Sequence, residues 1–257
     1  MAGITRSVLW LSFFGIILIS WAMMYMMAIG MGLDLFGRPM GMSMEMDMSM
    51  SMPMDQFGPL FGMWAAMMAA MMLPTLVPTL RSYEDLMVSA DGTRAGWTGV
   101  LLGYFVVWVA FAALITGVQL ALLASGLVDM LGMATSHWIG AGLLIAVGLF
   151  QFSRTKEICH GVCHSPMTYF LGHWFTGFTG GVRMGGGLGV FCVGCCWGFM
   201  ALGFVGGVMS LLWMGLATLF MVIEKLPQIG HYVTKPAGFA LILGGIGWGL
   251  WPVFLGG

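Results

Sequence analysis

The chain has 257 residues, enough for one or two soluble domains, but only 7% of them are charged, against about 25% in a typical soluble domain. With 60% apolar residues, this composition excludes a water-soluble globule and predicts helices that lie in lipid. The net charge of −1 argues against a nucleic-acid partner held by electrostatics. The 28 methionines outnumber the nine basic and ten acidic residues together, so sulfur is the main candidate for chemistry.

Uncharged stretches of about 20 residues predict membrane helices, because roughly 30 Å of hydrocarbon at about 1.5 Å per residue requires that length. Seven such stretches follow one another, which predicts an all-α, polytopic membrane helix bundle. The sixth is short and joins the fifth at Gly206–Gly207, so six spans plus a re-entrant segment is the alternative. The predicted spans are 8–29, 59–80, 100–123, 133–152, 184–205, 208–223 and 237–255.

The basic residues predict which side of the membrane each loop faces. With a cytoplasmic N-terminus and seven crossings, eight of the nine basic residues lie inside and only Arg38 lies outside, as the positive-inside rule requires. This topology divides the chain into an uncleaved N-terminal membrane anchor helix (1–29), a Met-rich extracytoplasmic loop (30–58) and a membrane helix bundle (59–257). Within the bundle, a cytoplasmic Cys/His segment covers 153–183.

Methionine occupies every even position from 40 to 54, between small, polar or acidic residues. An extended chain places alternate residues on one side, so all the thioethers can project along one edge. Thioether sulfur is soft and uncharged, and soft ligands select Cu(I), or silver by the same logic, over zinc, calcium or magnesium. A sacrificial oxidant trap and a low-complexity tract without a role are the alternatives. The predicted ligands are Met40, Met42, Met44, Met46, Met48, Met50, Met52 and Met54.

The second predicted span carries two methionine stripes, Met67 with Met71 and Met68 with Met72. Residues four apart share a helix face, so the stripes predict an intramembrane thioether site for Cu(I). Methionine as an ordinary apolar filler between helices is the alternative. Pro74 removes a helix hydrogen bond and predicts a bend near the inner end of this span.

Three cysteines fall within five residues of the fifth predicted span. On a helix, Cys192 shares a face with Cys195 and with Cys196, which lie three and four residues further on. Packing of buried thiols and thiol redox chemistry are alternatives, but three thiols so close together favour metal coordination. We expect them to share a sulfur site with the methionines of the second span.

Four potential ligands, Cys159, His160, Cys163 and His164, fall within six residues after the fourth predicted span. Thiolate and imidazole suit both Cu(I) and zinc. Zinc is the less favoured of the two, because the other sulfur clusters of the chain favour Cu(I). A c-type haem site is disfavoured because three residues rather than two separate the cysteines, and a disulfide is disfavoured by the predicted cytoplasmic location. The segment is therefore predicted to bind metal, with a structural or inert role as the alternative.

Several short strings occur together in a fixed order. They are 64–75 (W-A-A-M-M-A-A-M-M-L-P-T), Gln151 with Lys156, Cys159-x-x-x-Cys163-x-Ser165-Pro166, Cys192-x-x-Cys195-Cys196-Trp197, Gly206-Gly207-Val208-Met209, Trp213-Met214 and Glu224-Lys225. Over about residues 59–251, the chain resembles a bacterial family of unknown function described as predicted metal-binding integral membrane proteins. The resemblance implies a multi-pass protein of the bacterial inner (plasma) membrane with a metal site. His160 and His164 depart from the family's pattern.

Together these features predict a Cu(I)-binding membrane protein that is not an enzyme. The outer loop would capture copper, the Met and Cys residues of the bundle would hold or transfer it, and the inner Cys/His segment would receive it. In its chemistry alone this scheme is similar to that of eukaryotic high-affinity copper importers. The alternatives are an assembly factor that loads copper into a membrane oxidase or oxygenase, or passes it to a copper-chaperone partner, and a membrane thiol oxidoreductase.

Overall fold

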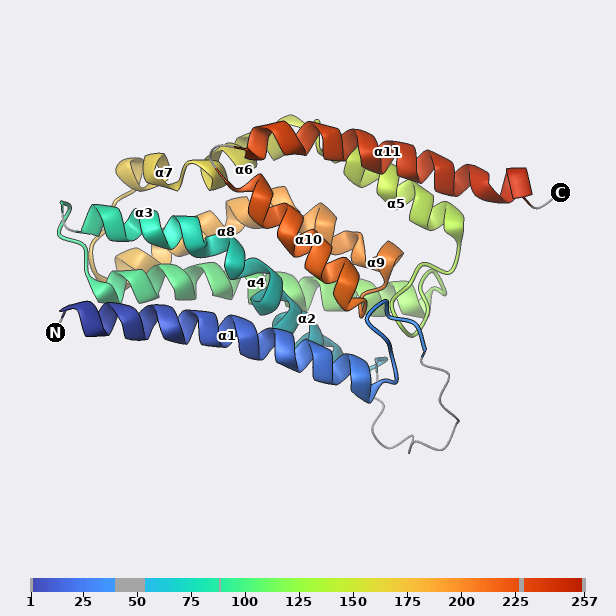
Figure 1. The fold of residues 1–257 in the computed structure, drawn as a ribbon, viewed down its shortest axis with the longest axis horizontal. Helices are drawn as coiled ribbons and strands as arrows, with labels where there is room; N and C mark the ends of the chain where they lie inside the picture. Colours follow the sequence, from blue (N-terminus) through green and yellow to red (C-terminus); the bar gives the residue numbers. More distant parts are fainter. Residues whose placement is uncertain (1, 40–53, 88, 227–228, 256–257) are drawn as a thin grey trace.

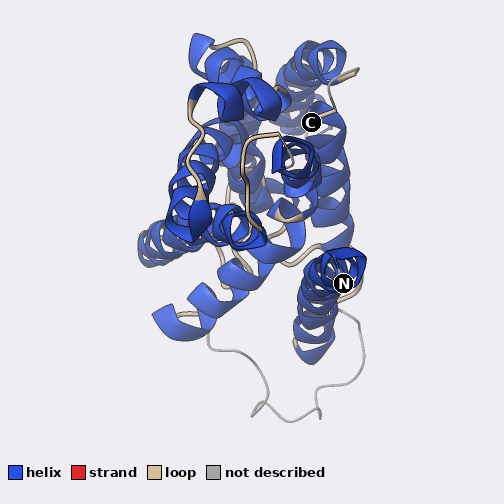
Figure 2. Ribbon diagram, turned by 90° about the vertical axis from the view of Figure 1, so that its left-hand side faces the viewer, coloured by secondary structure: helices blue, strands red, loops and turns tan. Residues whose placement is uncertain are grey.

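The structure is a computed structural model that describes residues 2–39, 54–87, 89–226 and 229–255. These residues form a bundle of helices and contain no strand, which confirms the all-α prediction (Figures 1 and 2). The helices are α1 (Ala2–Gly30), α2 (Phe57–Met72), the short 3₁₀ helix η2 (Pro74–Leu76), α3 (Val77–Met87), α4 (Arg94–Ala124), α5 (His137–Phe150), α6 (Arg154–His164), α7 (Pro166–Gly172), α8 (Gly177–Ala201), α9 (Gly203–Gly206), α10 (Leu211–Glu224) and α11 (Gly230–Leu255).

The prediction of seven full-length spans is corrected by the lengths of the helices. Among the described residues, five segments are long and apolar enough to cross a membrane: Thr5–Gly30, Phe57–Met87, Arg94–Ala124, Gly177–Gly206 and Tyr232–Leu250. α5 and α6 make a sixth only if they count as one broken span, because they bend by 64° where they meet. α10 has only 14 residues, which fits the alternative of a shorter, re-entrant segment.

Two local features set where α6 and α10 begin. The Ser153 side chain accepts a hydrogen bond from the backbone N–H of Lys156 at 3.1 Å, so a new helix begins just after α5 ends. Gly207 has φ +93°, a conformation that favours glycine, and Ser210 then caps α10 through the N–H of Trp213. The Ser210 cap falls inside the predicted span 208–223, whereas the Ser153 cap starts a new helix directly after the predicted span 133–152.

Glycines bring α4 and α8 into close contact along their length. A Cβ atom added at Gly185 would overlap the carbonyl oxygen of Val100, and one added at Gly103 would overlap that of Val182. Small residues allow such approach between membrane-type helices, where van der Waals contact supplies much of the packing energy. The same contact places Cys192 of α8 beside Tyr104 of α4.

Replacing Gly185 with alanine should destabilise the bundle by about 1–3 kcal/mol, since backbone atoms of α4 cannot move aside as a flexible side chain can. Thermal unfolding of the purified protein in detergent measures the effect. Gly186→Ala is the matched control, because a Cβ atom there has nothing within 4 Å. Equal melting temperatures for the two variants would show that the close contact does not exist.

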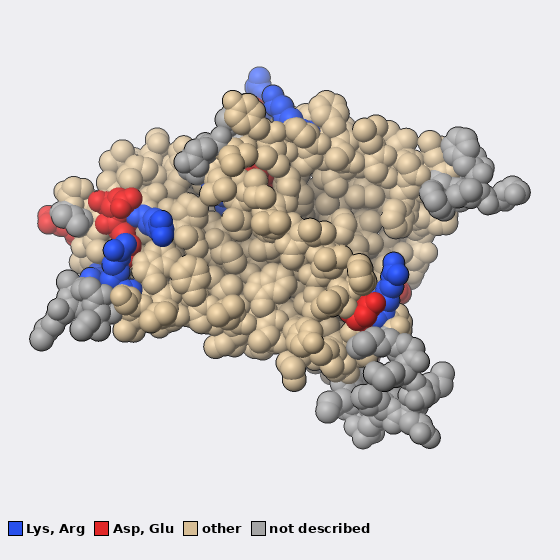
Figure 3. All heavy atoms as spheres, viewed as in Figure 1, with Lys and Arg blue, Asp and Glu red and all other residues tan. Residues whose placement is uncertain are grey.

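The outer surface of the bundle is mostly uncharged. In the view of Figure 3, most Lys, Arg, Asp and Glu side chains gather at the two ends of the long axis, with a further basic group at the upper edge. Large apolar side chains such as Leu11 and Leu18 of α1 and Leu243 of α11 are exposed between the ends. Apolar surface of this extent is unusual for a protein in water and suits contact with lipid.

Candidate metal centre

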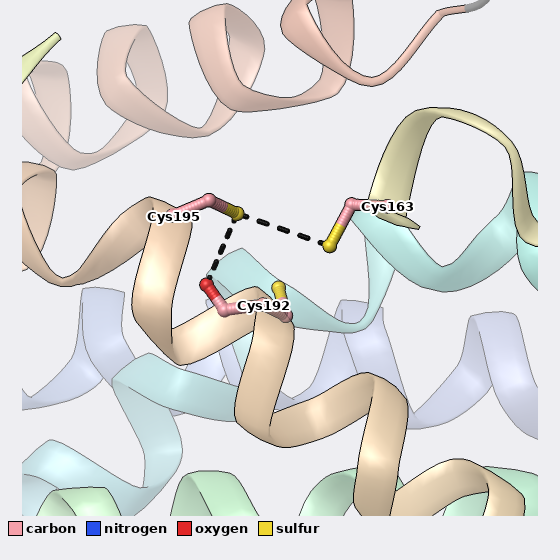
Figure 4. Close-up of side chains that lie close together, drawn as sticks. All are labelled: Cys163, Cys192 and Cys195. Atoms are coloured by element: carbon pink, nitrogen blue, oxygen red, sulfur yellow. Dashed lines mark hydrogen bonds between the residues drawn. The ribbon is translucent and has the colours of Figure 1, made fainter. Parts of the chain in front are cut away.

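Three cysteines from two helices meet inside the bundle. Cys163 of α6 faces Cys192 and Cys195 of α8, and the three sulfur atoms all lie within 4.8 Å of one another (Figure 4). The exposed fractions of these residues are 7%, 0% and 1%. We call Cys163, Cys192 and Cys195 the thiol cluster. Cys196 lies beside it, with its sulfur 3.2 Å from that of Cys195.

The spacing within the thiol cluster suits one soft metal ion. The sulfur atoms of Cys195 and Cys163 are 3.9 Å apart. A trigonal ion with metal–sulfur bonds of about 2.3 Å requires sulfur–sulfur separations of about 4 Å. Three thiols can therefore close around one ion with little movement, and thiolate ligands favour Cu(I) or zinc over hard cations.

The position of Cys163 depends on how α6 lies against α8. A Cβ atom added at Gly194 would come within 2.7 Å of the Cys159 sulfur, so α6 lies close against α8 at this glycine and a larger residue would require the Cys159 side chain to move. The Lys156 ammonium also donates a hydrogen bond to the carbonyl oxygen of Cys195 at 2.8 Å. These contacts hold the helix that carries Cys163 over the cysteines of α8.

Cys192 lies beside a buried positive charge. The Lys225 ammonium is 2.8 Å from the Cys192 sulfur and donates a second hydrogen bond to the Thr75 hydroxyl at 2.9 Å. The Tyr104 hydroxyl is 3.0 Å from the same sulfur. Three thiolates around a monovalent ion would leave two negative charges in an apolar interior, a costly arrangement unless positive charge is near. Lys225 supplies one such charge.

A second buried cation, Lys156, contacts Cys195 of the thiol cluster. Lys156 and Glu224 form an ion pair at 2.9 Å, with each side chain only 1% exposed. The Thr234 hydroxyl donates to the Glu224 carboxylate at 2.9 Å, so the pair links α6, α10 and α11. It fixes the end of α10, where Lys225 follows directly.

The predicted Cys/His segment separates into two parts. Cys163 lies in the thiol cluster, whereas Cys159, His160 and His164 do not belong to it. Cys159 is half-buried, and His160 Nε2 lies 2.8 Å from the backbone oxygen of Glu224. A ligand role for these three residues stays a prediction.

The predicted methionine ligands of the second span are all buried. Met67 and Met71 line a small cavity together with Met200 and Met214, and Met68 and Met72 lie in the core. Polar groups connect this span with Cys192, because the Thr75 hydroxyl lies 3.2 Å from the Tyr104 hydroxyl, which in turn lies 3.0 Å from the Cys192 sulfur. Of the Met-rich loop, residues 40–53 lie outside the described residues, and Met54 is buried.

Sequence reasoning missed the polar residues around the thiols. The positive-inside rule counts Lys156 and Lys225 among the cations of the cytoplasmic loops, yet both are buried, as is Glu224. The sequence does contain one indication of this, because Glu224 and Lys225 adjoin at the end of an apolar stretch. Ionisable residues in such surroundings usually have a functional partner.

The comparisons with known proteins agree with the chemistry of the thiol cluster. A family model named PpoB2 and described as a copper chaperone matches residues 61–248, a range that contains every cysteine of the chain. No curated protein and no solved structure matches the chain.

Proposed function

Because the chain belongs to the PpoB2 family of copper chaperones, we propose that it binds Cu(I) as cargo at the thiol cluster and delivers it to a partner. The observation that carries this proposal is the convergence of three buried thiols within 4.8 Å. Soft thiolates select Cu(I), and burial keeps the ion away from water and oxidants. The adjacent Lys225 offsets part of the negative charge of the thiolates.

The proposal places the protein in a bacterial inner membrane, with a cytoplasmic N-terminus and the Met-rich loop outside. The long apolar helices and the charges at the two ends of the bundle support this placement. In this arrangement the loop captures Cu(I), the sulfur side chains of the bundle hold it, and Cys159, His160 and His164 lie on the route of release.

The acceptor in this proposal is a copper enzyme, such as a membrane oxidase or oxygenase, or another copper chaperone. The family description supports delivery to a protein over release of free ion, since a chaperone hands its cargo to a partner. The thiols act as ligands throughout and are not consumed, so the proposed role is not enzymatic. Because neighbouring sulfur sites have similar softness, exchange between them needs only small movements.

Metal analysis of protein purified under reducing conditions from copper-supplemented cells tests the proposal. The parent protein should retain tightly bound Cu(I), and replacing Cys192, Cys195 and Cys196 together with serine should remove that tightly bound fraction. Deletion of residues 40–54 should lower the total copper bound and leave the tight site intact. If the cysteine variant retains as much tightly bound copper as the parent, the thiol cluster is not the cargo site.

A further inference from the structure

A second sulfur-lined space lies between α2, α8 and α10, and α8 also carries two cysteines of the thiol cluster. Four methionines line it: Met67 and Met71 of α2, Met200 of α8 and Met214 of α10. Each is at most 3% exposed. We call this space the thioether cavity. Two of its methionines belong to the stripe that the sequence singled out, whereas Met200 and Met214 join them only through the fold.

The thioether cavity has the size of one small ion. Its volume is about 10 Å³, close to the least that one water molecule occupies. A buried water would need two to four polar partners. Among the lining side chains only Trp213 carries a nitrogen or oxygen atom, and its Nε1 has no hydrogen-bond partner. The walls therefore suit a soft cation better than they suit water.

The donor set has the chemistry of a site for a monovalent soft ion. Thioether sulfur is neutral, so four methionines hold Cu(I) without placing negative charge in the apolar interior. The indole of Trp213 also lines the cavity, and an aromatic face attracts a cation.

The thioether cavity and the cysteines share helix α8, which suggests that an ion can pass between them. Met200 follows Cys196 by four residues on α8, so the two lie on one face about 6 Å apart along the helix axis. Cys196 in turn adjoins the thiol cluster, with its sulfur 3.2 Å from that of Cys195. Resting on the function proposed above, we infer that the thioether cavity is a second Cu(I) site, from which the ion passes to the thiol cluster. The transfer goes from neutral to anionic ligands, and an anionic site holds a cation more strongly.

A titration of the reduced full-length protein with Cu(I), read in two ways, tests this inference. Bound copper per chain counts all sites, while the ultraviolet charge-transfer band of copper thiolates reports copper bound to cysteine and not copper bound to methionine. Replacing Met200 and Met214 with leucine, a change that nearly conserves volume, should remove one bound copper and leave the charge-transfer band unchanged. The matched control is Met63→Leu with Met184→Leu, two buried methionines of α2 and α8 outside the cavity, which should bind as the parent does.

The outcomes separate this inference from the proposed function. If the Met200/Met214 variant binds as much copper as the parent, or loses the charge-transfer band, the thioether cavity is not an independent site. If the parent shows no charge-transfer band that depends on Cys192 and Cys195, the thiol cluster fails as the cargo site, whatever the methionine variants do. Equal melting temperatures for the two leucine pairs establish that a loss of copper is not a loss of fold.

Discussion

Replacing Cys163 with serine is expected to weaken Cu(I) binding at the thiol cluster by well over a hundredfold. The change removes one of the three sulfur atoms that lie within 4.8 Å of one another and leaves a hydroxyl, a hard and weak donor for a soft ion. Loss of a hydrogen-bonded neighbour of a metal ligand typically costs roughly 10–100-fold in affinity, and loss of a ligand itself should cost more. Competition with a Cu(I) chelator measures the change.

Cys159→Ser is the control for this experiment. Cys159 lies on α6 one helical turn before Cys163, is also a free thiol and is half-buried, but it does not belong to the thiol cluster. We expect less than about a tenfold effect from this change, because the three clustered sulfur atoms remain in place. A Cys159 variant that loses as much affinity as the Cys163 variant would mean that the cluster is assigned wrongly.

The contrast between these two cysteines shows what the sequence could and could not predict. Helical spacing alone was enough to place Cys192 and Cys195 on one face of α8. Nothing in the sequence distinguished Cys163 from Cys159, because both lie on the same face of α6. The fold makes the choice: α6 is bent by 64° from α5 and packs against α8 so that the sulfur of Cys163, and not that of Cys159, lies with those of Cys192 and Cys195.

The predicted number of spans differs from that in the structure for a related reason. Hydropathy measures whether a segment prefers lipid and contains little information about where the helical hydrogen-bond ladder is interrupted. The Pro74 bend was predictable because proline has no N–H, and the chain forms η2 there. The caps at Ser153 and Ser210 depend on one side-chain hydrogen bond each, and serine has this role at only some of its positions.

The burial of the lysines was not predicted, because the positive-inside rule counts every cation as exposed. The rule treats Lys156 and Lys225 as exposed cytoplasmic charges, but the fold pairs Lys156 with Glu224 and brings Lys225 to Cys192. Each lysine and its partner are more than 30 residues apart in the sequence. Burial of a charge is set by such a distant partner, so a single sequence does not reveal it.

Replacing Glu224 with glutamine is expected to destabilise the protein by about 3–5 kcal/mol. Lys156 would then remain as a buried charge without a counter-ion, and an unpaired charge in an apolar interior is the costly part of a broken ion pair. Because Lys156 also donates to the Cys195 carbonyl, displacement of its ammonium should loosen α6 and weaken copper binding. Unfolding in detergent and a chelator competition measure the two effects.

Glu84→Gln is the matched control, because Glu84 forms an ion pair with Arg6 at 2.8 Å in which the Arg6 side chain is 62% exposed. Water solvates an exposed guanidinium left alone, so this change should cost at most about 1 kcal/mol. A double variant, Lys156→Met with Glu224→Gln, should recover part of the lost stability, since it removes the unpaired charge as well. If Glu224→Gln costs no more than Glu84→Gln, then water reaches Lys156, and the interior that surrounds the thiol cluster is not apolar enough to protect a bound Cu(I).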